Sequence, residues 1–169
     1  HAYAQTSGAP VDESGQPIFH DLPASWEAAT SDGQRWRWAL ERAMKAYPAH
    51  RDQVRLQFAA FLRAQFGVQT LQRYGYFFGR RRGEDEDRDQ SGTYELHTLE
   101  EDETIARLAI GIRRFSLPEE YNFIRIYQRL TGDDQGGYAE TALQQLAQIY
   151  EDRQQYPKAA EQWQASIDR

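Results

Sequence analysis

The chain has 169 residues, 40% of them hydrophobic and 27% charged, which is typical of a globular domain and not of a disordered chain. Its net charge of −6 argues against nucleic acid as a partner, because the field of the whole molecule repels a phosphate backbone. The absence of cysteine excludes disulfides, thiolate metal sites and cysteine nucleophiles, and no apolar run is long enough for membrane insertion.

Residues 1–30 are rich in Gly, Pro, Ser and Ala, and three prolines interrupt any helix there. We therefore expect a flexible lead-in, in which Leu22 and Trp26 dock as a short turn. The AYA pattern at 2–4, before Gln5, has the small-x-small form of a signal-peptidase site and favours an exported, periplasmic or cell-envelope protein. A cloning scar or an arbitrary cut explains the same residues, so a cytoplasmic location stays an alternative.

Residues 31–67 predict a pair of amphipathic helices. The first begins at an N-cap, Ser31 or Asp32, and stops before Pro48. The second ends at Gly67, where we expect the left-handed conformation that glycine adopts after a helix. The short connection between them predicts antiparallel packing. The apolar faces, at helical spacing, are Trp36, Leu40, Ala43 and Tyr47 in the first helix and Val54, Phe58, Phe61, Leu62 and Phe66 in the second.

Two tryptophans of the first helix have different predicted roles. Trp36 belongs to the apolar stripe and is expected in the core. Trp38 lies two residues further on and so points to another side of the helix. We favour Trp38 as a cover for the lead-in, with an exposed anchor for a partner as the alternative.

Residues 68–98 are expected to form an irregular insertion, with a small hairpin as the alternative. The insertion contains a charged loop, 79–92. Arg80, Arg81 and Arg82 could clamp an acidic peptide or a lipid headgroup, but pairing with the acidic run that follows is the favoured interpretation. That acidic run lacks the ligand spacing of a calcium-binding loop.

The sequence contains no convincing cofactor or metal site. His97, Glu100 and Glu101 have the spacing of one helix face, yet no second histidine lies near and a solvated helix start is favoured. Phosphate-binding glycine motifs and the GxSxG nucleophile motif are absent. We therefore expect no cofactor and no enzymatic activity.

Residues 99–169 predict further helices. Thr98, followed by Glu100 and Glu101, resembles a capping box that would start a helix. Its expected apolar stripe is Ile105, Leu108, Ala109 and Ile112. A next helix starts at Pro118, and its expected inward residues are Phe123, Ile126, Tyr127 and Leu130. Two more helices, separated by the polar run EDRQQ, complete the chain.

The closing pair, residues 140–169, resembles a tetratricopeptide repeat, a helix-turn-helix unit of about 34 residues. The matching residues of the first helix are Leu143, Leu146, Ala147 and Tyr150, and those of the second are Tyr156, Ala159, Trp163 and Ser166. Ala147 and Ala159 would let the two backbones approach closely. Gln154 departs from the usual glycine at the turn. The stretch at 102–128 also resembles the helical lead-in of large exported bacterial proteins with alpha-2-macroglobulin-like domains.

The sequence thus predicts an all-α fold: antiparallel helix pairs in a short, right-handed stack resembling tetratricopeptide repeats, with a central insertion. The resemblance implies a non-enzymatic interaction or scaffolding module of a larger bacterial exported protein, since the chain ends at Arg169, two residues before a closing proline. It would bind a protein or peptide; the alternatives are a structural spacer packed on other domains of the same chain and, third, an enzyme of unknown class. The candidate partner-binding residues are Gln144, Gln148, Glu151 and Trp38.

Overall fold

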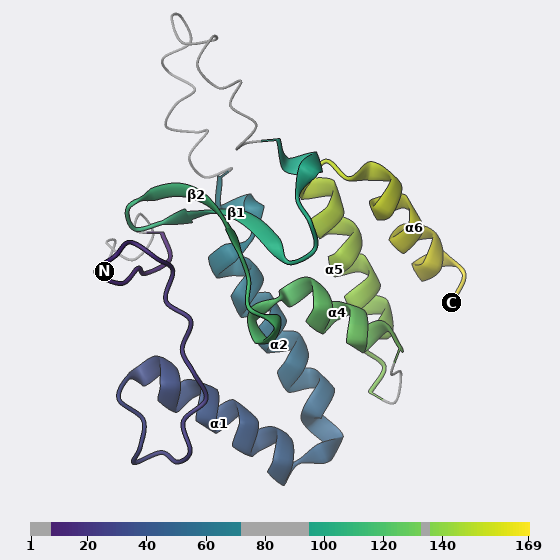
Figure 1. The fold of residues 1–169 in the computed structure, drawn as a ribbon. Helices are drawn as coiled ribbons and strands as arrows, with labels where there is room; N and C mark the ends of the chain where they lie inside the picture. The colour runs from purple at the N-terminus through teal and green to yellow at the C-terminus, as the bar shows by residue number, and fades with distance from the viewer. Residues whose placement is uncertain (1–7, 72–94, 133–135) are drawn as a thin grey trace, which may run out of the picture.

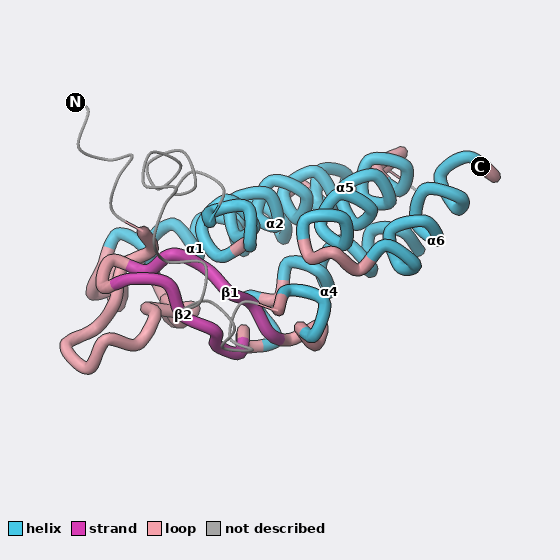
Figure 2. The backbone as a smooth tube through the Cα atoms, turned by 90° about the horizontal axis from the view of Figure 1, so that it is seen from above, coloured by secondary structure: helices cyan, strands magenta, loops and turns pink. Residues whose placement is uncertain are grey.

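The computed structural model describes residues 8–71, 95–132 and 136–169. Within these ranges the chain is mostly helical and contains one two-stranded antiparallel hairpin. The elements are α1 (Asp32–Ala46), α2 (Arg51–Phe66), β1 (Glu103–Leu108), β2 (Gly111–Ser116), α4 (Phe123–Gly132), α5 (Ala139–Asp152) and α6 (Tyr156–Ile167) (Figure 1). Seen from above, α2, α5 and α6 lie in one layer, with the hairpin and α4 on one face of it (Figure 2). The charged loop at 79–92, with Arg80, Arg81 and Arg82, lies outside the described residues.

The ends of the first helix pair follow from the sequence, with one difference. Ser31 is the N-cap of α1, and its hydroxyl accepts a hydrogen bond from the Gln34 N–H at 3.2 Å, as predicted. Gly67 does follow α2, but its φ of −75° is extended backbone and not the expected left-handed conformation. Glycine is required there for space, because a Cβ atom would lie 2.5 Å from the Arg63 carbonyl oxygen.

The helix predicted from Thr98 through Ile112 is wrong, and with it the all-α assignment. Residues 103–116 form the hairpin, and Gly111 takes a φ of 132° at its turn. Ile105 and Leu108 suggested a helix face because both are apolar and three residues apart. In the structure β1 is buried on both sides: Ile105 packs in a small cluster with Val68, and Leu108 packs in the main core. A strand buried on both faces loses the simple alternation that identifies a half-buried strand.

The lead-in differs from the expected flexible segment over residues 8–30. Ala9 is buried and pairs with β1: its N–H donates to the Arg107 carbonyl at 2.9 Å, and its carbonyl accepts from the Ala109 N–H at 2.9 Å. Phe19 then packs its ring 5.3 Å from that of Phe66 and 5.0 Å from that of Tyr121. The lead-in is therefore attached to the body by backbone pairing and by aromatic contacts.

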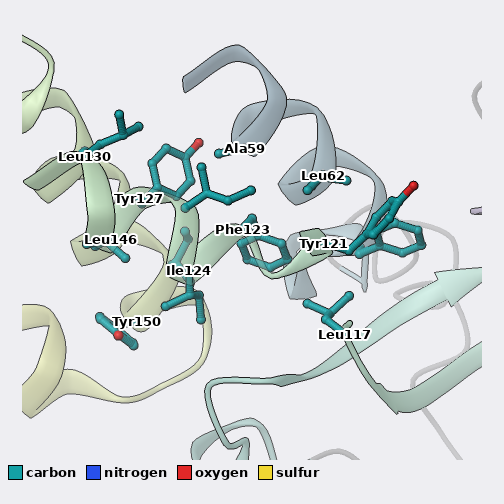
Figure 3. Packing of buried hydrophobic residues seen from close by; sticks show 14 of the residues in the cluster. Ala59, Leu62, Leu117, Tyr121, Phe123, Ile124, Tyr127, Leu130, Leu146 and Tyr150 are labelled. Atoms are coloured by element: carbon teal, nitrogen blue, oxygen red, sulfur yellow. The ribbon is translucent and has the colours of Figure 1, made fainter. Parts of the chain in front are cut away.

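The main core lies where α2, α4 and α5 meet. Figure 3 shows Ala59 and Leu62 of α2 facing Tyr127 and Phe123 of α4. All four inward residues predicted for the helix after Pro118 are buried, which confirms that face. Pro118 itself precedes a 3-10 turn, Glu119–Tyr121, and α4 begins only at Phe123.

The α5–α6 pair forms as the sequence predicts. The two helices pack against each other, and Ala147 of α5 and Ala159 of α6 are both buried. Gln154 stands at the turn with a φ of 57°, the left-handed conformation in which a glycine is usual. The side chain of Gln155, which follows, donates to the Leu99 carbonyl at 2.8 Å and so ties this turn to the segment before β1.

Candidate binding groove

A pocket of about 410 Å³ lies between α1, α2 and α4. We call it the α1–α2 groove. Its volume falls in the range of roughly 300–1,000 Å³ that is common for ligand sites. The groove is lined by Leu22, Arg37, Leu40, Glu41, Met44, Lys45, Arg51, Val54, Arg55, Phe58, Glu120, Ile126 and Arg129.

The two long helices line the groove with the same spacing. On α1 the lining residues include positions 37, 40, 41 and 44, and on α2 they include positions 51, 54, 55 and 58. Both sets follow the i, i+3, i+4, i+7 pattern of one helix face. In each set, two lining residues are apolar, Leu40 and Met44 on α1 and Val54 and Phe58 on α2, and two are charged, so the groove joins two amphipathic faces. We call these four apolar residues the floor of the groove.

Arg37 connects α1 to the body at one end of the groove. Its guanidinium donates to the Glu120 carboxylate at 2.9 Å and to the His20 carbonyl at 3.1 Å. It also lies over the rings of Phe58, at 5.3 Å, and Tyr121, at 4.9 Å. Burial works against the charge of Arg37, but the hydrogen bonds to Glu120 and Tyr121 raise its pKa overall, so the group stays cationic.

The groove lining is rich in positive charge. It contains five cationic side chains and two carboxylates, although the chain as a whole carries a net charge of −6. Lys45 pairs with Glu41 at 3.2 Å, and Arg55 pairs with Asp52, outside the lining, at 3.1 Å. Arg51 has no ion pair among the described residues, so its charge is available to a ligand.

Large apolar side chains are exposed beside the groove. No residue of α1 is buried, although the helix is amphipathic. Trp36, which the sequence places in the core, is 37% exposed, and its ring packs on those of Phe58 and Phe61, with centroids 5.6 and 4.6 Å away. Other exposed apolar side chains of this region are Leu22, Trp26, Tyr47 and Phe61. Exposed apolar surface of this extent commonly marks an interaction site.

The residues predicted to bind a partner do not lie in this groove. Gln144, Gln148 and Glu151 are on α5, where Gln144 donates to Glu140 at 3.1 Å and Gln148 is exposed. Glu151 accepts a hydrogen bond of 2.7 Å from the Trp163 indole. Trp38 is partly buried, and its ring centroid lies 6.0 Å from that of Trp26 in the lead-in, which agrees with the favoured role as a cover.

Sequence reasoning missed the groove. Arg37, Met44, Arg51 and Arg55 line it, and none of them was considered as a site residue. The signal that could have found them is the repeated arrangement of cationic and apolar residues at i, i+3, i+4 and i+7 on two neighbouring helices.

A second polar cluster, around Arg153, is structural. Arg153 is buried and donates to the carbonyls of Glu100, at 3.1 Å, and Glu103, at 2.8 Å. Nearby, the Tyr150 hydroxyl donates to Glu101 at 3.1 Å, and burial raises the pKa of Tyr150 to about 12. These groups hold the segment before β1 against the α5–α6 turn, and none of them lines the α1–α2 groove.

The part of the chain that the structure describes contains neither a cluster of metal ligands nor a membrane-spanning helix. There, no group of three or more His, Asp or Glu side chains is placed to hold a metal ion, and His97 has no such neighbours. Thr98 starts no helix: its hydroxyl donates to the Glu95 carbonyl at 2.7 Å. No helix in the described ranges is long and apolar enough to cross a membrane.

No similarity to a known protein indicates a function for the groove. Comparisons with protein-family models, with curated proteins and with solved structures gave no match.

Proposed function

We propose that the chain is a non-enzymatic protein-interaction module that docks a partner segment in the α1–α2 groove. The observation that carries the proposal is the groove itself, whose lining combines the apolar floor with charged side chains from two amphipathic helix faces. This is the arrangement in which a groove between helices accepts an amphipathic peptide, with apolar anchors in the floor and polar contacts at the rim.

The exposed aromatic side chains beside the groove support the same function. Trp36 of α1 and Phe61 of α2 form a tilted aromatic pair, and both side chains remain exposed to a partner. Aromatic residues are enriched at protein interfaces because they contribute much contact area at a small cost in conformational entropy.

The proposal includes the repeat architecture that the sequence suggests. The α5–α6 pair, in which Ala147 and Ala159 are both buried, supports a short tetratricopeptide-like, right-handed stack in a larger exported bacterial protein. In this setting the α1–α2 pair would be a divergent unit whose open side receives the partner.

The single methionine of the chain makes the function testable. Met44 lies in the groove lining, so its labelled methyl group gives one NMR signal inside the groove, apart from that of an initiator methionine. Peptides selected from a random display library on the full chain should shift this signal, and Val54→Glu should abolish both the shift and the binding. Peptides that bind without moving the Met44 signal, or no selected peptides at all, would contradict the proposal.

A structural spacer is the second candidate, and one observation favours it. Ala159 is the single buried residue of α6, whereas Ile167 is 77% exposed and Tyr156 is 63% exposed. Such an uncovered face suits packing against a neighbouring domain. Because the chain has no cysteine, an Ile167→Cys variant offers one thiol for attaching a photoactivated cross-linker through a maleimide, and this group should form specific cross-links to a neighbouring domain in the longer protein. The absence of such cross-links would contradict the spacer.

A further inference from the structure

Cationic side chains surround one end of the groove floor. Lys45 is in the last turn of α1, and Arg51 and Arg55 are one turn apart at the start of α2. Between them the floor is apolar, formed by Met44 and Val54. A ligand that fits this surface needs an apolar side chain for the floor and negative charge beside it.

The ion pairs already present at the rim can be exchanged for pairs with a ligand. Lys45 and Arg129 keep side-chain exposures of 70% and 64%, although they pair with Glu41 and Glu119. Exposed pairs of this kind contribute little to stability, because water and salt screen the charges. Arg51 can pair with a ligand without breaking an existing ion pair, because it has none among the described residues.

We propose that the occupant of the α1–α2 groove is an acidic amphipathic peptide segment of a partner protein, in which apolar anchors are flanked by Asp or Glu. The assignment rests on the proposed function and adds the chemistry of the partner. A second copy of this chain is a poorer occupant, because it brings a net charge of −6 to a molecule that already carries −6. Arg51 also stands at the first residue of α2, where the helix dipole disfavours a cation and favours a bound carboxylate.

Three matched peptides test the assignment. Each has leucines at the spacing of one helix face, and the positions between them are filled with Glu and Ala, Gln and Ala, or Lys and Ala. The full-length chain, labelled at the Met44 methyl group, is titrated with each peptide. The Glu peptide should shift the Met44 signal and bind at least tenfold more tightly than the Gln peptide, with an affinity that falls as salt rises. The Lys peptide should not bind.

Arg51 provides the matched variant. Arg51→Gln should weaken the Glu peptide by about threefold to fivefold, the effect of one exposed ion pair, and leave the Gln peptide unchanged. Arg42→Gln, an exposed arginine of α1 outside the lining, makes the same change in net charge and should alter neither affinity. Arg51→Glu should reverse the preference toward the Lys peptide. Unfolding curves should show that none of the three variants is less stable than the parent chain.

The possible results distinguish a failure of the acidic-peptide assignment from a failure of the proposed interaction function. Equal binding of the Glu and Gln peptides in the groove, or equal effects of the Arg51 and Arg42 variants, overturns the acidic assignment and leaves the interaction function standing. A Met44 shift that depends on the concentration of the chain alone identifies a second copy as the occupant and also overturns it. If neither these peptides nor the library-selected ones move the Met44 signal, both proposals fail.

Discussion

At the scale of single residues, the buried ionic groups of the described chain serve the fold. Arg153 heads the fully buried side chains in volume and keeps two backbone carbonyls satisfied. Burial lowers its pKa to about 10, which leaves the guanidinium charged at neutral pH. In the hairpin, Arg114 donates to the Glu103 carboxylate at 2.6 Å, and this hydrogen bond holds the pKa of Glu103 below its usual value.

Arg153→Met should destabilise the chain strongly. The variant keeps most of the side-chain volume but removes the guanidinium that donates to the carbonyls of Glu100 and Glu103, at a cost of about 3 kcal/mol for the two lost hydrogen bonds. Urea unfolding followed by circular dichroism measures the loss. Arg42→Met, at an exposed position, is the control and should change the free energy of unfolding by less than about 0.5 kcal/mol. A similar loss in both variants would contradict the structural role of Arg153.

Glu103→Gln should lower the stability only where Glu103 is ionised. The pKa of Glu103 is lower in the folded than in the unfolded chain, so ionised Glu103 stabilises the folded state. This stabilisation is fully present above pH 4.5, the ordinary pKa, and is lost as the pH falls through the lower pKa of the folded chain. At pH 7 the variant should be less stable by about 1 kcal/mol, and this difference should shrink as the pH falls below 4.5 and disappear only below the folded value. The test is the midpoint of urea unfolding, measured for the variant and the parent chain across this pH range. A difference in midpoint that does not depend on pH would contradict the ion pair.

At the scale of elements, the sequence predicts local pairs better than long-range contacts. Ser31 marks the start of α1 and Gly67 the end of α2, and both can be recognised from the sequence because their effects involve only neighbouring residues. The hairpin was missed because β1 is buried on both faces, so Ile105 and Leu108 mimic a helix stripe. The pairing of Ala9 with β1 has no local signal at all, since a single buried alanine in a Pro-rich segment shows no periodicity.

The α5–α6 contact gives a test with adjacent residues. Ala159 is buried at the contact, and Ala160, next to it on α6, is exposed. Ala159→Leu should force the two helices apart and cost about 1–3 kcal/mol of stability. Ala160→Leu adds the same side chain to the same helix and should have little effect. Thermal unfolding of both variants compares them directly; a larger loss for Ala160→Leu would refute the close approach of the helices.

At the scale of the whole molecule, α1 is the least integrated helix. It contributes no buried residue, and Arg37 forms its main polar link to the body, through Glu120 and the His20 carbonyl. The candidate site could not be predicted from the sequence for the same reason. The groove lies between α1, α2 and α4, so it depends on how these helices are placed relative to one another. That placement is set by contacts such as Arg37–Glu120, which join distant parts of the chain.

Arg37→Ala should loosen α1 without unfolding the core. Removing the ion pair and the ring contacts leaves α1 held mainly by Trp36 and the turn to α2. Amide hydrogen exchange in α1 should accelerate by about tenfold or more, while exchange in α4 and α5 stays near that of the parent chain. Arg42→Ala on the same helix is the control. Equal acceleration in α1 and α5 would show that the helix unfolds together with the core and not independently of it.

The pairing of Ala9 with Leu108 also bears on the order in which the molecule assembles. The two residues are about one hundred positions apart, so joining them closes a long loop, whereas α5 and α6 are neighbours along the chain. Contacts between sequence neighbours form at a small entropic cost and those between distant segments form late. The C-terminal helices should therefore reach their final arrangement first in a refolding experiment, and the N-terminal segment should join the hairpin edge in the last kinetic phase.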